Sequence, residues 1–405
     1  MRTLTDNAIA HLVFDLSWHS DGVQHVARQH GEKASLWRDI FPDGLERRLP
    51  GAEQGQIISA SFAPGTLLPA ASARDMVTIA ARDWDCDLVP GLRIEPAPGR
   101  YYPRGLIWKA GVAGIYKPNS QPLRVVSLDG ERIVVDLGHP LAGVPLQIDI
   151  DVREVLEERQ GDQGGRSNDW VRALTTGPGI EARREGGRAD YHRGEGLLPL
   201  DPGDDALFYE TDRMTSHIDR VAQAELAGLY ARKLADGMAL LDLMSSLQSH
   251  LPAALRPASV TGLGMNAREL AANPRLTERL VHDLNRDPRL PLASESLDAA
   301  LCALSIEYLT RPLAVVDEIA RVLKPGAPFI VSWSQRWFPS EASGLWMGLY
   351  PFERVGYVLD LLERSGRFEA LESFSVHGRA RPDDDPHIGQ DVMSDPIFAV
   401  WGHRR

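Results

Sequence analysis

Cysteine is scarce in this 405-residue sequence, and long apolar runs are missing. The two cysteines, Cys86 and Cys302, lie far apart, which argues against a disulfide framework or a cysteine-based metal site. No run approaches the roughly 20 apolar residues that span a bilayer, and no basic start with an apolar core marks a signal peptide. We therefore expect a cytoplasmic protein without a metal site.

An excess of basic residues is also missing. Lys and Arg number 44 against 56 Asp and Glu, so the formal net charge is −12. Proteins that bind nucleic acid or anionic membranes need clustered Lys and Arg to neutralise phosphate groups, so we expect neither partner. The hydrophobic content of 43% is that of a globular protein, and the length predicts more than one domain.

The sequence divides into three parts by composition and pattern. Residues 1–156 alternate apolar and polar residues in short runs, which predicts a β-rich domain with strands at 8–16, 56–62, 123–126, 132–135 and 146–152. The turn Leu128-Asp129-Gly130 favours a hairpin between two of them. Residues 157–204 are rich in Gly, Arg, Asp and Gln, which is typical of a linker. Residues 205–405 form the third part.

The third part alternates predicted strands and helices. Strands are expected at 239–243, 259–263, 279–283, 298–304 and 327–333, with helices between them, of which 312–323 has the clearest apolar face. A helix at 352–364 precedes strands at 368–376 and 396–401, which we expect to form an antiparallel hairpin at the edge of the sheet. This order predicts an α/β domain with a doubly wound, mostly parallel sheet.

A ligand loop is expected after the first of these strands. The apolar run Ala239 to Leu243 contains Asp242 and is followed by Met244, Ser245 and Ser246. Ligands bind at the carboxyl ends of parallel strands in such sheets. Because an unpaired charge at the end of a buried strand is costly, we favour a site role for Asp242 over a structural one.

Several motifs of the third part resemble those of class I S-adenosylmethionine (SAM)-dependent methyltransferases. The carriers are Ser296-Leu297-Asp298-Ala299-Ala300, the helix and turn from Asp317 to Gly326, and the loop from Asp283 to Leu292. The resemblance covers about 205–401. It implies a Rossmann-like fold, SAM as cofactor, and methyl transfer to a small-molecule acceptor, such as a thiol or another soft nucleophile.

Two departures from that family concern the cofactor loops. The glycine-rich first loop is replaced by Met244-Ser245-Ser246, whose hydroxyls and N–H groups we expect to meet a carboxylate. The acidic residue after the second strand is replaced by Met265 and Asn266. The resemblance implies cofactor-binding roles for Tyr209, Arg213, Asp242, Met244, Ser245, Ser246, Gly262, Leu263, Gly264, Met265, Asn266, Asp283, Leu284, Asn285 and Ser305.

Two residues are candidates for catalysis. His217 suits a general base because an unperturbed imidazole titrates near working pH. The segment that carries it, with Arg213 and Asp219, is either a lid over the cofactor or substrate, or a capping and salt-bridge cluster at the start of a helix. Tyr308 would orient the acceptor or shield the methyl group, or be a packed aromatic. No base is needed if the acceptor is an ionised thiol.

A group of aromatic residues after the fifth strand has two interpretations. It forms an acceptor pocket, or it is an apolar cover for the sheet or a seat for the N-terminal domain. The group comprises Trp333, Trp337, Phe338, Trp346 and Tyr350.

Part of the N-terminal domain resembles the SlyD-type FKBP family. The carriers are Ile133 to Gly143 and Phe41 to Gly51, and Ala81 to Pro122 would correspond to the inserted chaperone-like module, which implies a protein client. His139 then lies in a structural turn. Trp18, Phe41 and Phe62 do not fall on the family's prolyl-pocket positions, so a docking or capture scaffold is favoured over a prolyl isomerase. The alternative for the whole chain is a non-catalytic scaffold or a chaperone.

Overall fold

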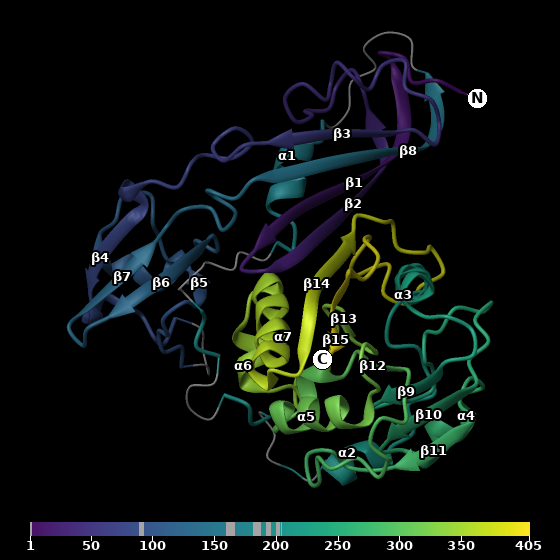
Figure 1. The fold of residues 1–405 in the computed structure, drawn as a ribbon. Helices are drawn as coiled ribbons and strands as arrows, with labels where there is room; N and C mark the ends of the chain where they lie inside the picture. Colours follow the sequence, from purple (N-terminus) through teal and green to yellow (C-terminus); the bar gives the residue numbers. More distant parts are fainter. Residues whose placement is uncertain are drawn as a thin grey trace. The chain divides into compact units, whose positions relative to one another are not determined.

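The computed structural model describes residues 2–88, 93–158, 167–180, 188–191, 196–199, 203 and 205–405. The Gly-rich and Arg-rich stretches of the predicted linker, 160–166 and 181–187, lie outside these ranges. The chain forms two compact units, and each is considered by itself: residues 1–21, 33–196 and 348–356, and residues 22–32, 197–347 and 357–405. Figure 1 shows their elements.

The first unit is built from antiparallel strands. Strand β8 (Leu146–Glu158) pairs with β1 (Ala8–Ser20) on one side and with β3 (Ile57–Phe62) on the other. A separate sheet has the order β4 (Met76–Ala80), β7 (Arg132–Asp136), β6 (Pro122–Leu128) and β5 (Tyr101–Pro103). The short helices are η1 (Ala73–Asp75), η2 (Ala81–Asp83), η3 (Arg104–Ala110) and α1 (Trp170–Thr175).

The strands predicted in 1–156 are present, and the Asp129-Gly130 turn joins β6 to β7. The module around the second sheet is larger than the predicted insert of 81–122, because β4 and β7 flank that range and share its apolar core, including Ile79 and Val135. His139 lies in a turn, where its Nδ1 accepts a hydrogen bond from the Leu141 amide at 3.1 Å.

The second unit contains one mixed sheet. Its strand order is β11 (Glu278–Val281), β10 (Ser259–Gly264), β9 (Ala239–Leu243), β12 (Ala299–Ala303), β13 (Pro328–Trp333), β15 (Ile397–Arg404), β14 (Phe368–His377) and β2 (Val23–Ser35). The five strands from β11 to β13 are parallel, and β15 runs antiparallel to its neighbours. Strand order reverses between β9 and β12, which is where ligands bind in open α/β sheets.

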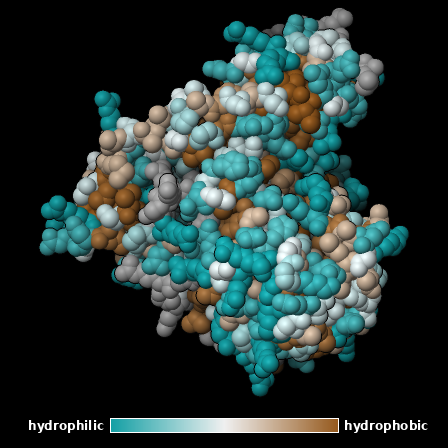
Figure 2. All heavy atoms as spheres, viewed as in Figure 1, coloured by the Kyte–Doolittle hydropathy of each residue, from teal (hydrophilic) through white to brown (hydrophobic). Residues whose placement is uncertain are grey.

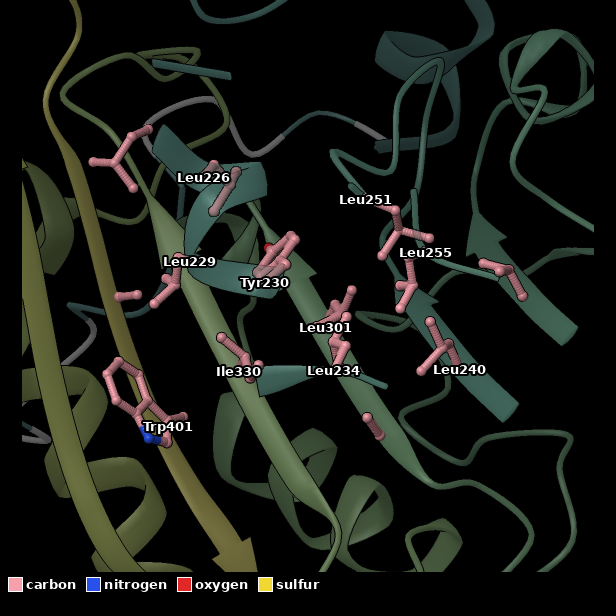
Figure 3. Packing of buried hydrophobic residues seen from close by; sticks show 14 of the residues in the cluster. Leu226, Leu229, Tyr230, Leu234, Leu240, Leu251, Leu255, Leu301, Ile330 and Trp401 are labelled. Carbon is pink, nitrogen blue, oxygen red and sulfur yellow. The ribbon is translucent and has the colours of Figure 1, made fainter. Parts of the chain in front are cut away.

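Helix α3 (Arg220–Lys233) covers one face of this sheet. Leu226, Leu229 and Tyr230 point at Leu301 and Ile330 on the strands, as Figure 3 shows. Helix α5 (Pro312–Val322) lies on the other side of the strands in Figure 1. The remaining helices are α2 (Asp205–Glu210), α4 (Ala267–Ala272), η4 (Ile306–Tyr308), α6 (Gly344–Gly348) and α7 (Pro351–Ser365).

Two predictions about the connections are wrong. No helix lies between β9 and β10: residues 244–258 run in turns and irregular structure, with Met244 at φ 55° and His250 at φ 52°, and Pro252 and Pro257 oppose helix continuation. Residues 282–298, before β12, also lack a helix. The connection between β10 and β11 contains a helix, α4, as predicted.

The β14–β15 hairpin is antiparallel, as predicted, but it is not at the edge. Strand β2 pairs in parallel with β14, from Gln24 beside Glu372 to Gln29 beside His377. The sequence conceals β2 because several of its buried positions are polar, among them His25, Gln29 and His30. His25 Nδ1 and Ser373 Oγ are hydrogen-bonded at 2.7 Å. This pairing is the reason that residues 22–32 cluster with the second unit, whereas the predicted domain boundary lies at 156.

The hydropathy of the visible surface of the second unit agrees with the burial of apolar side chains in its core. On the face of the second unit that Figure 2 shows, hydrophilic and intermediate residues predominate and apolar areas are small. No helix in the described part of the chain combines the length and apolar character needed to cross a membrane.

Candidate functional site

A cavity of about 390 Å³ lies in the second unit at the carboxyl ends of the parallel strands. The loops that follow β9, β10, β11 and β12 line it, together with residues 213–217, residues 336–341 and His387. Its position is the one at which ligands bind in open α/β sheets, and its volume is in the usual range for small-molecule sites, roughly 300–1,000 Å³.

All the predicted site residues except Gly262 line this cavity. They are Tyr209, Arg213, His217, Asp242, Met244, Ser245, Ser246, Leu263, Gly264, Met265, Asn266, Asp283, Leu284, Asn285, Ser305 and Tyr308. At Gly262 a Cβ atom would lie 2.4 Å from Leu276 Cδ1. Close packing between β10 and Leu276, in the segment before β11, accounts for glycine at position 262.

Asp242 lies beside the cavity with its carboxylate almost wholly buried. Ser245 Oγ donates a hydrogen bond to Asp242 Oδ2 at 2.6 Å, and Ser249 provides a second hydroxyl contact. Burial raises the pKa of Asp242 to about 6, although both hydroxyl contacts oppose the shift. A carboxylate so placed gains from a cationic neighbour, because the desolvated charge is otherwise costly.

The turn Met244-Ser245-Ser246 after β9, called the serine turn below, does not offer its hydroxyl groups to a ligand in the way we predicted. Ser245 Oγ donates to Asp242, Ser246 Oγ donates to Glu269, and the Ser245 amide donates to the Leu263 carbonyl at 2.7 Å. These groups hold the turn in place by bonding within the protein. Their oxygen lone pairs remain able to accept.

Two residues of the β10–β11 connection support the same turn. Asn273, fully buried, donates through Nδ2 to the Ser246 carbonyl at 2.9 Å and to Ser249 Oγ at 3.0 Å. Glu269 accepts from Ser246 and, through Oε1, from the Arg213 amide at 2.7 Å. The carboxylate of Glu269 thus joins the turn after β9 to the segment before α3.

Asn266 has a structural role as well as a place in the cavity wall. Its Oδ1 accepts from the Arg268 and Glu269 amides and caps α4, while its Nδ2 donates to the Tyr209 carbonyl and to Asp212. The side-chain amide is therefore used within the protein. We predicted that Asn266 would take part in binding a ribose, and these four bonds leave it little capacity to do so.

The loop after β11 is tied to the loop after β12. Asp283 Oδ1 accepts from the Asn285 and Arg286 amides, and the Asn285 side chain donates to the Tyr308 carbonyl at 2.9 Å and accepts from the Thr310 amide at 2.9 Å. Leu284 is buried between them. The arrangement gives the cavity a fixed wall with an apolar side chain and one carboxylate.

Tyr308 is a packed aromatic that also lines the cavity. Its hydroxyl accepts a hydrogen bond from the Phe338 amide at 3.0 Å, and its ring stacks on that of Phe338 with centroids 6.0 Å apart. Burial, helped by the Glu307 carboxylate, raises the pKa of Tyr308 well above its usual value. The hydroxyl therefore keeps its proton at neutral pH and is unsuited to act as a base.

Four histidines line the cavity: His217, His250, His282 and His387. Burial lowers the pKa of His217, and it lowers the pKa of His250 to about 4 with a contribution from His217. Both rings are therefore neutral at neutral pH and able to accept a proton. His250 was not predicted as a site residue, and it lies in irregular backbone and not at a helix start.

The segment before α3 has features of both predicted roles, a capping cluster at the start of a helix and a wall of the cavity. Asp219 caps α3 by accepting from the Val221 and Ala222 amides. Arg213 and His217 line the cavity, but the Arg213 guanidinium lies 4.0 Å from the ring centroid of Phe208 and donates to two backbone carbonyls. Arg213 consequently holds this segment together.

The aromatic group after β13 has three different positions. Trp337 and Phe338 line the cavity. Trp333 and Trp346 are fully buried and pack edge to face, so they belong to the core. Tyr350 belongs to the first unit, where its hydroxyl donates to the Ser120 carbonyl at 2.7 Å.

Six charged or titratable lining residues were missed by the sequence analysis: His250, Glu269, His282, Arg336, Glu341 and His387. His387 comes from the β14–β15 loop. That loop is held by Arg381, whose guanidinium is 3% exposed and contacts Asp395 at 2.8 Å, Asp385 at 3.2 Å and Asp219 at 3.5 Å. The acidic run 383–385 is thus partly paired and not simply solvated: Asp384 pairs with Arg220 at 3.1 Å.

Comparison with known proteins agrees with this geometry. Residues 245–331 match a family model described as "Methyltransferase domain". The C-terminal part of the chain therefore contains a methyltransferase domain, on an α/β fold with a mixed sheet.

The N-terminal region is similar to a second family. An FKBP-type peptidyl-prolyl cis-trans isomerase SlyD from Treponema pallidum (strain Nichols) is 32% identical over 123 residues, which is 30% of this chain and 60% of the relative. The chain thus spans 60% of the length of the curated relative that it matches. A SlyD-like region is fused to a methyltransferase domain.

Solved structures with similar folds include enzymes of different kinds. A SAM-dependent methyltransferase from Thermotoga maritima, described as a possible histamine N-methyltransferase, is 17% identical and covers 46% of this chain and 88% of its own, with a TM-score of 0.34. The [4+2]-cyclase SpnF is 17% identical and covers 48% and 86%, with a TM-score of 0.33. Likenesses at this level carry no argument about activity.

The methyltransferase domain implies SAM as cofactor, and the residues present fit it. A Cβ on Gly264 would lie 2.1 Å from the Ser245 carbonyl oxygen, so only glycine lets β10 approach the turn after β9 this closely beside the cavity. The buried Asp242 carboxylate suits an ammonium group, and Met265 and Leu284 offer apolar surface for a purine. Among the residues described, no group of three or more His, Cys, Asp or Glu is placed to hold a metal ion.

Proposed function

We propose that this protein transfers a methyl group from SAM to a small-molecule acceptor. The observation that carries the proposal is the cavity beside Asp242, at the carboxyl ends of the parallel strands and lined by residues from the methyltransferase-like motifs. When bound, SAM supplies an electrophilic methyl group. Asp242 would bind the ammonium of its amino-acid part, and the walls formed by Met265 and Leu284 would contain the purine.

The remaining residues suit the acceptor side of the reaction. His217 and His250 are neutral because burial lowers the pKa of each, and His217 is the preferred base because the pKa of His250 falls to about 4. Tyr308 and Phe338 form an apolar wall that excludes water and restrains the acceptor. An ionised thiol or another soft nucleophile would react without a base, mainly through proximity and alignment.

The first test is ligand binding followed by transfer. Calorimetry should detect binding of SAM and of S-adenosylhomocysteine, and thermal unfolding should shift upward by several degrees at saturating ligand, because binding to the native state stabilises it by mass action. Labelled methyl from SAM should appear in a small-molecule fraction of cell extract. Equal labelling by the wild type and by Asp242→Ala would contradict the proposal.

A second candidate function is supported by the serine turn and by the SlyD-like region. The turn's hydroxyl groups bond to the protein's own carboxylates, and the relative of the N-terminal region is a prolyl isomerase. The chain would then be a non-catalytic scaffold or a chaperone that binds a protein client. Suppression of aggregation of a client protein, together with the absence of any thermal shift on adding SAM, would favour this candidate.

A further inference from the structure

We propose that the acceptor is a small amine, whose ammonium group is bound by Glu341 at the side of the cavity away from the cofactor loops. The inference rests on the proposed methyl transfer and narrows its substrate class. It depends on the burial of Glu341, on its position in the fold and on the charge balance of the cavity.

Glu341 is a buried carboxylate that faces the cavity. Its residue is 8% exposed and lines the cavity wall. Its backbone amide donates to the Phe338 carbonyl at 3.1 Å, but within the described ranges its carboxylate forms no hydrogen bond and no ion pair. Charged side chains are almost never buried without a partner, so a cationic group of a ligand is the missing partner.

The position of Glu341 separates it from the cofactor loops. It follows β13, whereas Asp242 lies near the end of β9, and Met265 and Leu284 follow β10 and β11. The strand order places β13 on one side of β9 and β10 and β11 on the other. Glu341 therefore lies at the end of the cavity where Tyr308 and Phe338 form an apolar wall, and where an acceptor would lie next to a cofactor bound along β9 and β10.

The charge balance of the cavity favours a second cation. The carboxylates of Asp242, Glu269, Asp283 and Glu341 line it against the guanidinium groups of Arg213 and Arg336. Arg213 lies against Phe208 and donates to backbone carbonyls. Arg336 contacts Asp395 at 3.5 Å. SAM brings one net positive charge, and an ammonium would balance the rest.

The reaction can be written with every atom placed. The ammonium gives one proton to the neutral imidazole of His217, which leaves a lone pair on nitrogen. That lone pair forms the new N–C bond to the methyl carbon while the C–S bond breaks. The electron pair of the C–S bond stays on sulfur, which becomes a neutral thioether. The nitrogen becomes a methylated ammonium, and Glu341 faces a cation before and after transfer.

The experiment compares acceptor classes and a carboxylate variant. SAM affinity is measured first by calorimetry for the wild type, Glu341→Gln and the control Glu295→Gln, whose carboxylate is exposed. A panel of small primary amines, with thiols and alcohols of matching carbon skeleton, is then assayed for labelled methyl transfer. Binding of the same amines to protein saturated with S-adenosylhomocysteine is a second readout, independent of turnover.

We expect transfer to amines, with an amine KM raised about tenfold or more in Glu341→Gln because a charge-assisted hydrogen bond is lost. SAM affinity should be unchanged and the melting temperature should not fall, and Glu341→Asp, which keeps the charge, should recover part of the affinity. Glu295→Gln should behave as the wild type.

The outcomes separate the two proposals. Absence of SAM binding would refute methyl transfer itself. If SAM binds but thiols or alcohols are methylated in place of amines, the amine inference is wrong while methyl transfer stands. The amine inference is also wrong if amines fail to bind the S-adenosylhomocysteine complex, or if Glu341→Gln binds and methylates them with wild-type constants.

Discussion

Replacing Asp242 by asparagine should stabilise the unliganded protein while weakening cofactor binding. Burial raises the pKa of Asp242 from 3.8 to about 6, so the folded protein holds this proton more tightly than the unfolded chain does. The stabilisation from the protonated form is complete below about pH 3.8 and is lost as the pH rises through about 6. Asparagine keeps the shape and the hydrogen bonds without the charge.

The size of the effect follows from that shift. With pKa values of 3.8 unfolded and about 6 folded, ionisation of Asp242 reduces the free energy of unfolding by about 3 kcal/mol at pH 7 and by about 1.6 kcal/mol at pH 5. The stability advantage of Asp242→Asn should therefore grow by about 1.4 kcal/mol between pH 5 and pH 7. Denaturant unfolding of both proteins across this range measures it.

A neighbouring carboxylate provides the control. Asp298 accepts from the Ala239 amide at 2.9 Å and from Lys324 at 2.7 Å, and these bonds lower its pKa. Asp298→Asn should thus destabilise the protein near neutral pH, with a loss that shrinks as the pH falls. Equal unfolding midpoints for Asp242→Asn and the wild type at every pH from 5 to 8 would refute the reasoning about Asp242, as would undiminished binding of SAM.

Two further changes test the packing around the cavity. Gly264→Ala places a Cβ 2.1 Å from the Ser245 carbonyl oxygen, so we expect it to abolish SAM binding in calorimetry and to destabilise by about 2 kcal/mol or more; Gly228→Ala, whose Cβ meets nothing within 4 Å, should be neutral or stabilising. Arg381→Met removes the guanidinium that pairs with the buried carboxylates of Asp219 and Asp395; Asp395 keeps its contact with Arg336 at 3.5 Å, and the loss should cost about 3 kcal/mol in denaturant unfolding. Wild-type stability of either variant would contradict the packing described.

The predictable part of the fold is the part with continuous apolar runs. Strands β9, β12 and β13 lie inside the parallel sheet, so their sequences are apolar on both faces and their ranges were predicted closely. Strand β2 lacks this signal because polar residues such as His25 and Gln29 occupy buried positions, and the hydrogen bond to Ser373 on β14 helps to offset the burial of His25. The missing helix after β9 is a local effect of proline and of left-handed backbone at Met244 and His250.

The predictable part of the site is the part that follows strand ends. Asp242 was found because it lies near the end of an apolar strand, and Met265 and Asp283 were found because the loops that carry them were compared with those of the methyltransferase family. Glu269 comes three residues after Asn266, a spacing typical of a helix N-terminus. Nothing in the local sequence shows that its carboxylate accepts a hydrogen bond from Ser246 in the serine turn. Glu341 lies in irregular chain after β13 and carries no pattern at all, so only the structure brings it to the cavity.

The serine turn shows why a missing glycine motif is a poor guide to whether such a site has been lost. Glycine in the usual loop supplies left-handed backbone and room for a ligand. Here Met244 takes the left-handed conformation, and Ser245 and Ser246 are held by Asp242 and Glu269. The position that must be glycine lies on β10 and not in the turn: Gly264 has no Cβ and so leaves space for the Ser245 carbonyl. Side-chain hydrogen bonds thus hold a turn that glycine elsewhere permits, with the cavity beside Asp242 open.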